Sequence, residues 1–148
     1  MTAIDRRGGM KAALAAGVGL AAIGAARADA PAAKRVVYHL ADAEKVVFVL
    51  GNLRNHLAGA GGPEAIQLAV VVHGRALHVL RGQSPDVALK SDVRQLISEG
   101  VVFHACANTM AAMKLKLDDL LPGFRVAEKG GVVLLADLQA QGWVYLRP

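Results

Sequence analysis

The sequence predicts a three-layer α/β/α domain built on a mainly parallel, five-stranded sheet. Short runs rich in β-branched and aromatic residues alternate with longer segments whose apolar residues recur at helical spacing. The run 65–72 is almost wholly apolar, as expected for an inner strand that is covered on both faces. Strands that alternate with helices are typical of parallel sheets with crossover helices, and this pattern indicates the α/β fold class.

The elements follow one another in a regular order. Strands are predicted over 35–40, 65–72, 101–105, 124–127 and 143–147. Helices are predicted over about 46–57, 86–98, 108–120 and 131–141, with one or two helical turns over 76–80. Asp42 is a candidate N-cap for the first helix, and the glycine-rich stretch 59–63 ends that helix. Because these glycines follow a helix rather than a strand, they predict a turn and not a phosphate-binding loop.

The first thirty residues have the organisation of a signal peptide. A basic pair, Arg6-Arg7, precedes an uncharged apolar run over 12–26, and residues 28–30 have the small-x-small pattern of a cleavage site. The run is shorter than the ~20 apolar residues that span a bilayer. The arginine pair suggests the twin-arginine export route. We therefore expect a bacterial, periplasmic protein that is not stably inserted in the membrane after cleavage.

Charge and composition narrow the functional classes of the mature domain, residues 31–148. Cleavage after Ala30 would remove four cations and two anions, so the formal charge would fall from +5 to +3. Aromatic residues make up 4% of the chain, and lysine and arginine form no stripe, so we expect no nucleic-acid partner. No Gly-x-Ser-x-Gly motif is present, which disfavours a serine hydrolase.

The only cysteine, Cys106, lies where a predicted strand meets a predicted helix. Asn108 or Thr109 can cap that helix. Ligands and catalytic groups usually lie at such carboxyl ends of parallel strands. The unpaired N–H groups of a helix start stabilise an anion, so a lowered thiol pKa and a nucleophilic thiolate are expected. The alternative is that Cys106 is a small buried apolar residue. A single cysteine excludes an intramolecular disulfide and Cys-x-x-Cys chemistry.

Three predicted strands end in a histidine, at His39, His73 and His104. Because the carboxyl ends of parallel strands share one edge, these imidazoles could line the edge that presents Cys106 and act there as acid or base. Side chains alternate between the two faces of a sheet, so the three histidines need not converge, and each could instead bond a nearby loop. No metal-ligand spacing such as His-x-x-x-His is present, and we expect no metal and no other cofactor.

Five motifs occur in order along the mature domain. They are Val-Val-Tyr-His-Leu-x-Asp (36–42), Gly-Asn-Leu-Arg-Asn-His (51–56), Val-Val-Val-His-Gly (70–74), Phe-His-Ala-Cys-Ala-Asn-Thr (103–109), and Gly-Val-Val-x-Leu with Gln-Gly-Trp-x-Tyr (131–145). This ordered set resembles the DsrE/DsrF-like family. The resemblance implies the α/β/α fold, assembly into trimers or hexamers, and partner proteins that donate and accept sulfur. In the sulfur-relay members, which act in the cytoplasm, a cysteine after the central strand carries a persulfide, and Cys106 occupies the matching position.

Two functional hypotheses follow from these observations. In the first, Cys106 accepts a sulfane sulfur and holds it as a persulfide in sulfur metabolism, with or without sulfurtransferase-like catalysis. In the second, the protein is a non-catalytic oligomeric module that binds a small ligand or a partner's tail at the strand edge. The residues expected to assist Cys106 in catalysis are His104 and His73, and those expected in binding are His39, Asn108 and Thr109.

Overall fold

The computed structural model describes residues 33–148, and the predicted signal segment 1–30 lies outside the described residues. The strands are β1 (Lys34–Leu40), β2 (Ile66–Val72), β3 (Val102–Cys106), β4 (Phe124–Ala127) and β5 (Val144–Leu146). The helices are α1 (Val46–Ala60), α2 (Arg75–Val79), α3 (Val87–Ser98), α4 (Ala107–Ala112) and α5 (Gly131–Ala140), with two 3-10 turns, η1 (Ala43–Lys45) and η2 (Leu117–Asp119). Within this described part of the chain, no helix has the length and apolarity needed to cross a bilayer.

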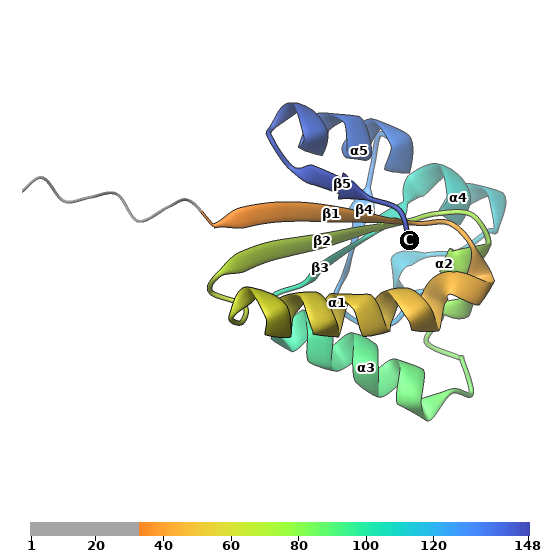
Figure 1. Cartoon of the computed structure of the whole chain (residues 1–148). Helices are drawn as coiled ribbons and strands as arrows, with labels where there is room; N and C mark the ends of the chain where they lie inside the picture. Colours follow the sequence, from red (N-terminus) through yellow and green to blue (C-terminus); the bar gives the residue numbers. More distant parts are fainter. Residues whose placement is uncertain (1–32) are drawn as a thin grey trace, which may run out of the picture. The chain divides into compact units, whose positions relative to one another are not determined.

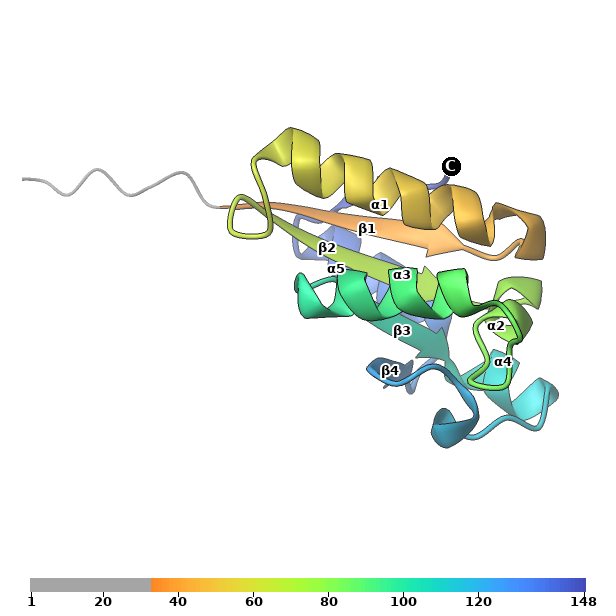
Figure 2. The ribbon, with the colours of Figure 1, turned by 90° about the horizontal axis from the view of Figure 1, so that it is seen from below.

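The five strands form one sheet in the order β4-β3-β2-β1-β5, and all four neighbouring pairs are parallel (Figure 1). The predicted fold class is therefore confirmed. The chain moves outward from β1 to β4 and then returns across the sheet through α5 to place β5 on the other side of β1. In such sheets, functional groups gather at the carboxyl ends of the strands. Figure 2 shows α2 and α4 at that end.

Helices cover both faces of the sheet. Figures 1 and 2 show α1 and α3 side by side on one face and α5 on the other. The larger core lies beneath α1 and α3 and includes Val70, Val72, Phe103 and Ala105, all almost inaccessible to solvent. The smaller core lies beneath α5 and consists of Val37, Ala69, Val71 and Leu135. Side chains alternate along a strand, so the odd-numbered positions of β1 and β2 and the even-numbered positions of β3 face α5.

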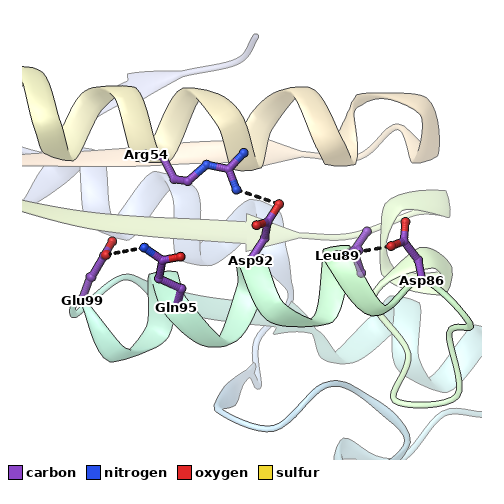
Figure 3. A network of polar contacts seen from close by, with 6 residues as sticks. All are labelled: Arg54, Asp86, Leu89, Asp92, Gln95 and Glu99. Atoms are coloured by element: carbon purple, nitrogen blue, oxygen red, sulfur yellow. Dashed lines mark hydrogen bonds and ion pairs between the residues drawn. The ribbon is translucent and has the colours of Figure 1, made fainter.

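Polar contacts at the surface join α1 to α3 and close the start of α3 (Figure 3). Arg54 Nη1 lies 2.6 Å from Asp92 Oδ2, and Asp86 Oδ1 accepts a hydrogen bond of 2.9 Å from the Leu89 N–H as the N-cap of α3. Exposed ion pairs of this kind contribute at most about 1 kcal/mol. Burial of the facing apolar residues supplies most of the attraction between these helices and the sheet. Those residues are Leu50, Leu53, Leu89, Val93 and Leu96.

The helix after Cys106 is shorter than the prediction of 108–120, which is wrong in this respect. α4 ends at Ala112, and Cys106 itself is the N-cap residue in place of Asn108 or Thr109. Lys114 then adopts a left-handed φ of 54°, which stops the helix. Of the apolar residues that mimic helical spacing, Met110 and Leu120 are buried and Leu117 is exposed. Beside Leu120, the N–H of Leu121 donates to the Leu80 C=O at 3.0 Å.

The predicted N-cap at Asp42 is also wrong in detail. Asp42 precedes η1, but its side chain makes no capping hydrogen bond. The carboxylate instead forms an ion pair of 3.9 Å with Arg147 next to the carboxyl end of β1.

Gly51 offers a direct test of helix packing. A Cβ at this position, inside α1, would meet no atom within 4 Å, so Gly51→Ala is expected to raise the free energy of unfolding by about 0.5–1 kcal/mol. Chemical denaturation measures the change. Gly123→Ala is the matched control, because Gly123 has a φ of +98° and its Cβ would lie 2.8 Å from Ile97 Cδ1. That variant should lose stability, and a shift of both variants in the same direction would contradict the described packing.

Candidate functional site

Cys106 ends β3 on the face of the sheet that α5 covers, and its residue is only 6% exposed. The local sequence explains this position. The short β-branched and aromatic run of β3 ends here, and α4 begins with the next residue. The start of α5 lies against the same sulfur, because the N–H of Gly131 donates to Cys106 Sγ at 3.1 Å. Two helices therefore begin at one thiol.

The environment of Cys106 favours its thiolate. Burial acts to raise the pKa of the thiol and is the largest single influence. It is opposed by hydrogen bonds from the Gly131 N–H, from the N–H and hydroxyl of Thr109, and from the Asn108 N–H. Together these donors outweigh burial, so the pKa of Cys106 lies below its ordinary value. The backbone donors belong to the first turns of α4 and α5, where N–H groups have no helical partner.

The pair Gly130-Gly131 allows α5 to approach the sulfur this closely. A Cβ on Gly131 would lie 3.2 Å from Val71 Cγ1 and 3.3 Å from Cys106 Cβ. Gly130 has a φ of +99°, and a Cβ there would lie 2.8 Å from Asn108 Nδ2. The sequence predicts a helix that starts at Gly131 but does not reveal the part of this glycine in the site. The signal was the glycine pair at a predicted helix start, where capping alone calls for no second glycine.

Thr109 joins the thiol to the end of β2. Its Oγ1 accepts a hydrogen bond of 3.1 Å from the N–H of Gly74. The hydroxyl oxygen is occupied as an acceptor, which leaves the hydroxyl hydrogen for donation toward Cys106. The predicted binding residues Asn108 and Thr109 thus lie at the site, and both act on the sulfur from the first turn of α4.

Two of the three predicted histidines come together. His39 Nε2 and His73 Nε2 are in direct contact, and the other ring nitrogen of His39, Nδ1, lies 2.6 Å from the hydroxyl of Tyr145. Burial, the neighbouring His73 and Arg147 lower the pKa of His39 to about 4, against an opposing influence of Asp42. Burial and Arg147 also lower the pKa of His73. Tyr145 closes the Gln-Gly-Trp-x-Tyr motif, but no local pattern in the sequence predicts its part in the site.

His104 shares the α5 face but lies apart from that pair. Burial, and then Arg125 on the neighbouring strand, lower its pKa. It lines a cavity of about 180 Å³ together with Gly130, Leu134 and Asp137. No histidine among residues 33–148 makes a hydrogen bond with Cys106 Sγ, and the expected help of His104 to the thiol stays a prediction. In the same range, no three histidine, cysteine or acidic side chains form a ligand set for a metal ion.

The fold and the site define a class of α/β/α domains that present one free cysteine at the carboxyl edge of a parallel sheet. The chain belongs to the DsrE/DsrF-like family, whose match covers residues 19–148. This family is associated with sulfur relay. No curated protein matches the chain significantly.

Solved structures show the same fold. The protein of unknown function MTH1491 from Methanobacterium thermoautotrophicum is similar at 35% identity, with a TM-score of 0.69 over 78% of this chain and 99% of that one. The conserved protein BT1422 from Bacteroides thetaiotaomicron has 13% identity and a TM-score of 0.61, over 78% of this chain and 95% of its own. The ychN protein from E. coli has 20% identity and a TM-score of 0.59, over 78% and 99%. The latter two likenesses concern the fold alone.

The hydroxyl of Thr109 gives a test of the thiolate environment. Thr109→Val keeps the shape of the side chain but removes the hydroxyl donor, so the pKa of Cys106 should rise. The pH dependence of alkylation by iodoacetamide measures this, and its midpoint should move to higher pH. Ser98→Ala is the control, because this hydroxyl bonds Gln95 on α3, which covers the opposite face of the sheet. An unchanged midpoint in Thr109→Val would show that the hydroxyl does not act on the sulfur.

Proposed function

We propose that this protein carries sulfane sulfur as a persulfide on Cys106. The observation that supports the proposal best is the hydrogen bond from the Gly131 N–H to one nearly buried sulfur, whose pKa is lowered by this N–H and by Thr109 and Asn108 at the start of α4. A structural cysteine in an apolar core has no need of such donors, and burial alone would keep its thiol protonated. Membership of a family associated with sulfur relay agrees with this chemistry.

The proposed transfer step moves one sulfur atom between two thiolates. The thiolate of Cys106 attacks the outer sulfur of a donor persulfide, R–S–SH. A new S–S bond forms on Cys106, the S–S bond of the donor breaks, and its electron pair leaves with the thiolate R–S⁻. Negative charge lies on sulfur before and after transfer, and the fixed N–H groups of Gly131 and Asn108 stabilise an anion at that position without reorganisation. Delivery to an acceptor thiol reverses these steps.

Export and assembly belong to the same proposal. The segment 1–30 directs the protein to the periplasm, and the mature domain forms a homo-oligomer that meets sulfur donor and acceptor proteins there. Cell fractionation together with the mass of the purified protein under native conditions tests both statements. A cytoplasmic, full-length monomer would contradict them while leaving the chemistry of Cys106 open to its own test.

Sulfur loading is tested by intact-mass analysis after incubation with polysulfide or thiosulfate. The wild-type protein should gain the mass of one sulfur atom, and a thiol reductant should remove it. Cys106→Ser, which replaces only the sulfur, should gain nothing. If wild-type protein gains no sulfur and Cys106 titrates as an ordinary thiol, the carrier function fails. The non-catalytic binding module would then be the better account, and Cys106→Ala would leave its function intact.

A further inference from the structure

Four side chains form a row across neighbouring strands at the carboxyl edge of the sheet. Tyr145 on β5 pairs with Val37 on β1, and Val37 lies two residues before His39 on the same strand. The ladder between β1 and β2 continues one step beyond β2, because the His73 N–H donates to the Leu40 C=O at 3.0 Å. Between β2 and β3 the last register pair is Val72 with Ala105, so His73 and Cys106 occupy the next positions on adjacent strands. All four side chains are on the α5 face.

Hydrogen bonds connect the first three members of this row. Tyr145 Oη lies 2.6 Å from His39 Nδ1, and His39 Nε2 meets His73 Nε2. The two imidazole centroids are 4.5 Å apart with their planes inclined by 21°, so the rings meet nitrogen to nitrogen rather than face over face. A hydrogen bond between the two Nε2 atoms requires one ring to donate its hydrogen and the other ring to accept it. A shift of the hydrogen along the chain exchanges the tautomers of both rings without changing their charge.

The charges around the pair keep both rings neutral at neutral pH. The titratable groups that face it are Tyr145, Asp42 and Arg147, and the last two form an ion pair. Burial and Arg147 disfavour an imidazolium at either ring, against the weaker influence of Asp42. Because residues 33–148 gather no third ligand beside the two rings, the pair suits proton transfer better than metal binding.

We propose that Tyr145, His39 and His73 form a proton relay that serves Cys106 during sulfur transfer. His73 follows β2 at the position next to that of Cys106 on the adjacent strand, and neighbouring strands are about 4.8 Å apart along the hydrogen-bonding direction. The two side chains make no direct hydrogen bond, so the proton passes through the bound donor or a water molecule. His39 and Tyr145 are positioning residues that set the tautomer of His73 and connect it to solvent. Tyr145 is 36% exposed and can exchange its hydroxyl proton with water.

The proton balance of the relay closes without an external oxidant or reductant. Before Cys106 attacks R–S–SH as a thiolate, the proton of its thiol passes to the free ring nitrogen of His73. The hydrogen in the bond between the two rings moves from His73 to His39, a hydrogen moves from His39 to the Tyr145 oxygen, and Tyr145 releases its own proton to water. The leaving thiolate R–S⁻ takes one proton as the relay returns to its first tautomer. The sum is Cys–SH plus R–S–SH giving Cys–S–SH plus R–SH.

This inference rests on the proposed sulfur loading. The final yield of loading tests the carrier function, and the rate of loading tests the relay. His73→Ala should slow loading at neutral pH by roughly 10²-fold, since a positioned acid–base group typically contributes 10²–10⁴-fold. Imidazole added to the solution should restore part of the rate, which a merely structural role for His73 would not allow. The final yield of persulfide should equal that of wild-type protein. His78→Ala is the control, because His78 is exposed on α2 and should load at the wild-type rate.

Tyr145→Phe keeps the ring and removes only the hydroxyl, so it tests the relay in a protein that retains its packing. It should load several-fold more slowly than wild type and should lose the solvent deuterium isotope effect expected of a proton moving during the reaction. Loading of His73→Ala at the wild-type rate, or a slow rate that imidazole does not change, would overturn the relay while the carrier function stands. Absence of loading in wild-type protein would overturn both.

Discussion

The hydrogen bond from the Gly131 N–H to Cys106 Sγ is the interaction on which the site depends. It requires α5 to begin against the end of β3, although the two residues are 25 positions apart in the sequence. A Cβ at position 131 would press on Val71 and Cys106, so glycine lets the helix start at this distance without a shift of these neighbours. From there α5 crosses the sheet above Val37 and Ala69 and returns the chain to β5. The position of the thiol and the topology of the sheet are thus set together.

The donors around Cys106 are mainly backbone N–H groups, and this has an energetic consequence. A side-chain donor must give up rotamer freedom to hold its position, whereas a backbone donor in a helix is already fixed by the fold. The burial that would otherwise keep the thiol neutral also strengthens each of these hydrogen bonds. The sulfur is therefore both nearly inaccessible to solvent and biased toward its anion, two properties that conflict in an ordinary core.

Much of the fold could be predicted from local patterns. The strand order along the chain, the inner position of β2 and the helical character of α3 and α5 all follow from apolar periodicity and from the glycines between elements. The error after Cys106 has a physical reason. Met110, Leu117 and Leu120 recur at helical spacing, but Lys114 turns into the left-handed region, and Leu120 packs as part of a loop beside the strand edge. Periodicity alone does not show that the helix ends before Leu117, which is exposed, and Leu120, which is buried.

The site was predictable only in part. Cys106 stood out because a lone cysteine lies at a junction between strand and helix, a signal contained in a few consecutive residues. The contact between His39 and Tyr145 joins positions 106 residues apart and depends on β5 lying beside β1, which no local pattern specifies. The shared face of His39 and His73 follows from strand register, which becomes known only when the strands are paired.

The Cys106 thiolate and the neutral histidine pair can coexist at this edge because different groups stabilise them. A cysteine activated by an imidazolium depends on the charge of its partner, so that the titration of one group moves the other. Here the thiolate is stabilised by N–H groups that do not titrate, and the histidine pair beside it is held neutral by burial and Arg147. The thiol can therefore ionise without a charged histidine, and the neutral imidazoles remain free to take up and return a proton. A sulfur carrier needs an ionised cysteine and a neutral imidazole at the same pH, because it must accept sulfur as a thiolate and release a protonated product.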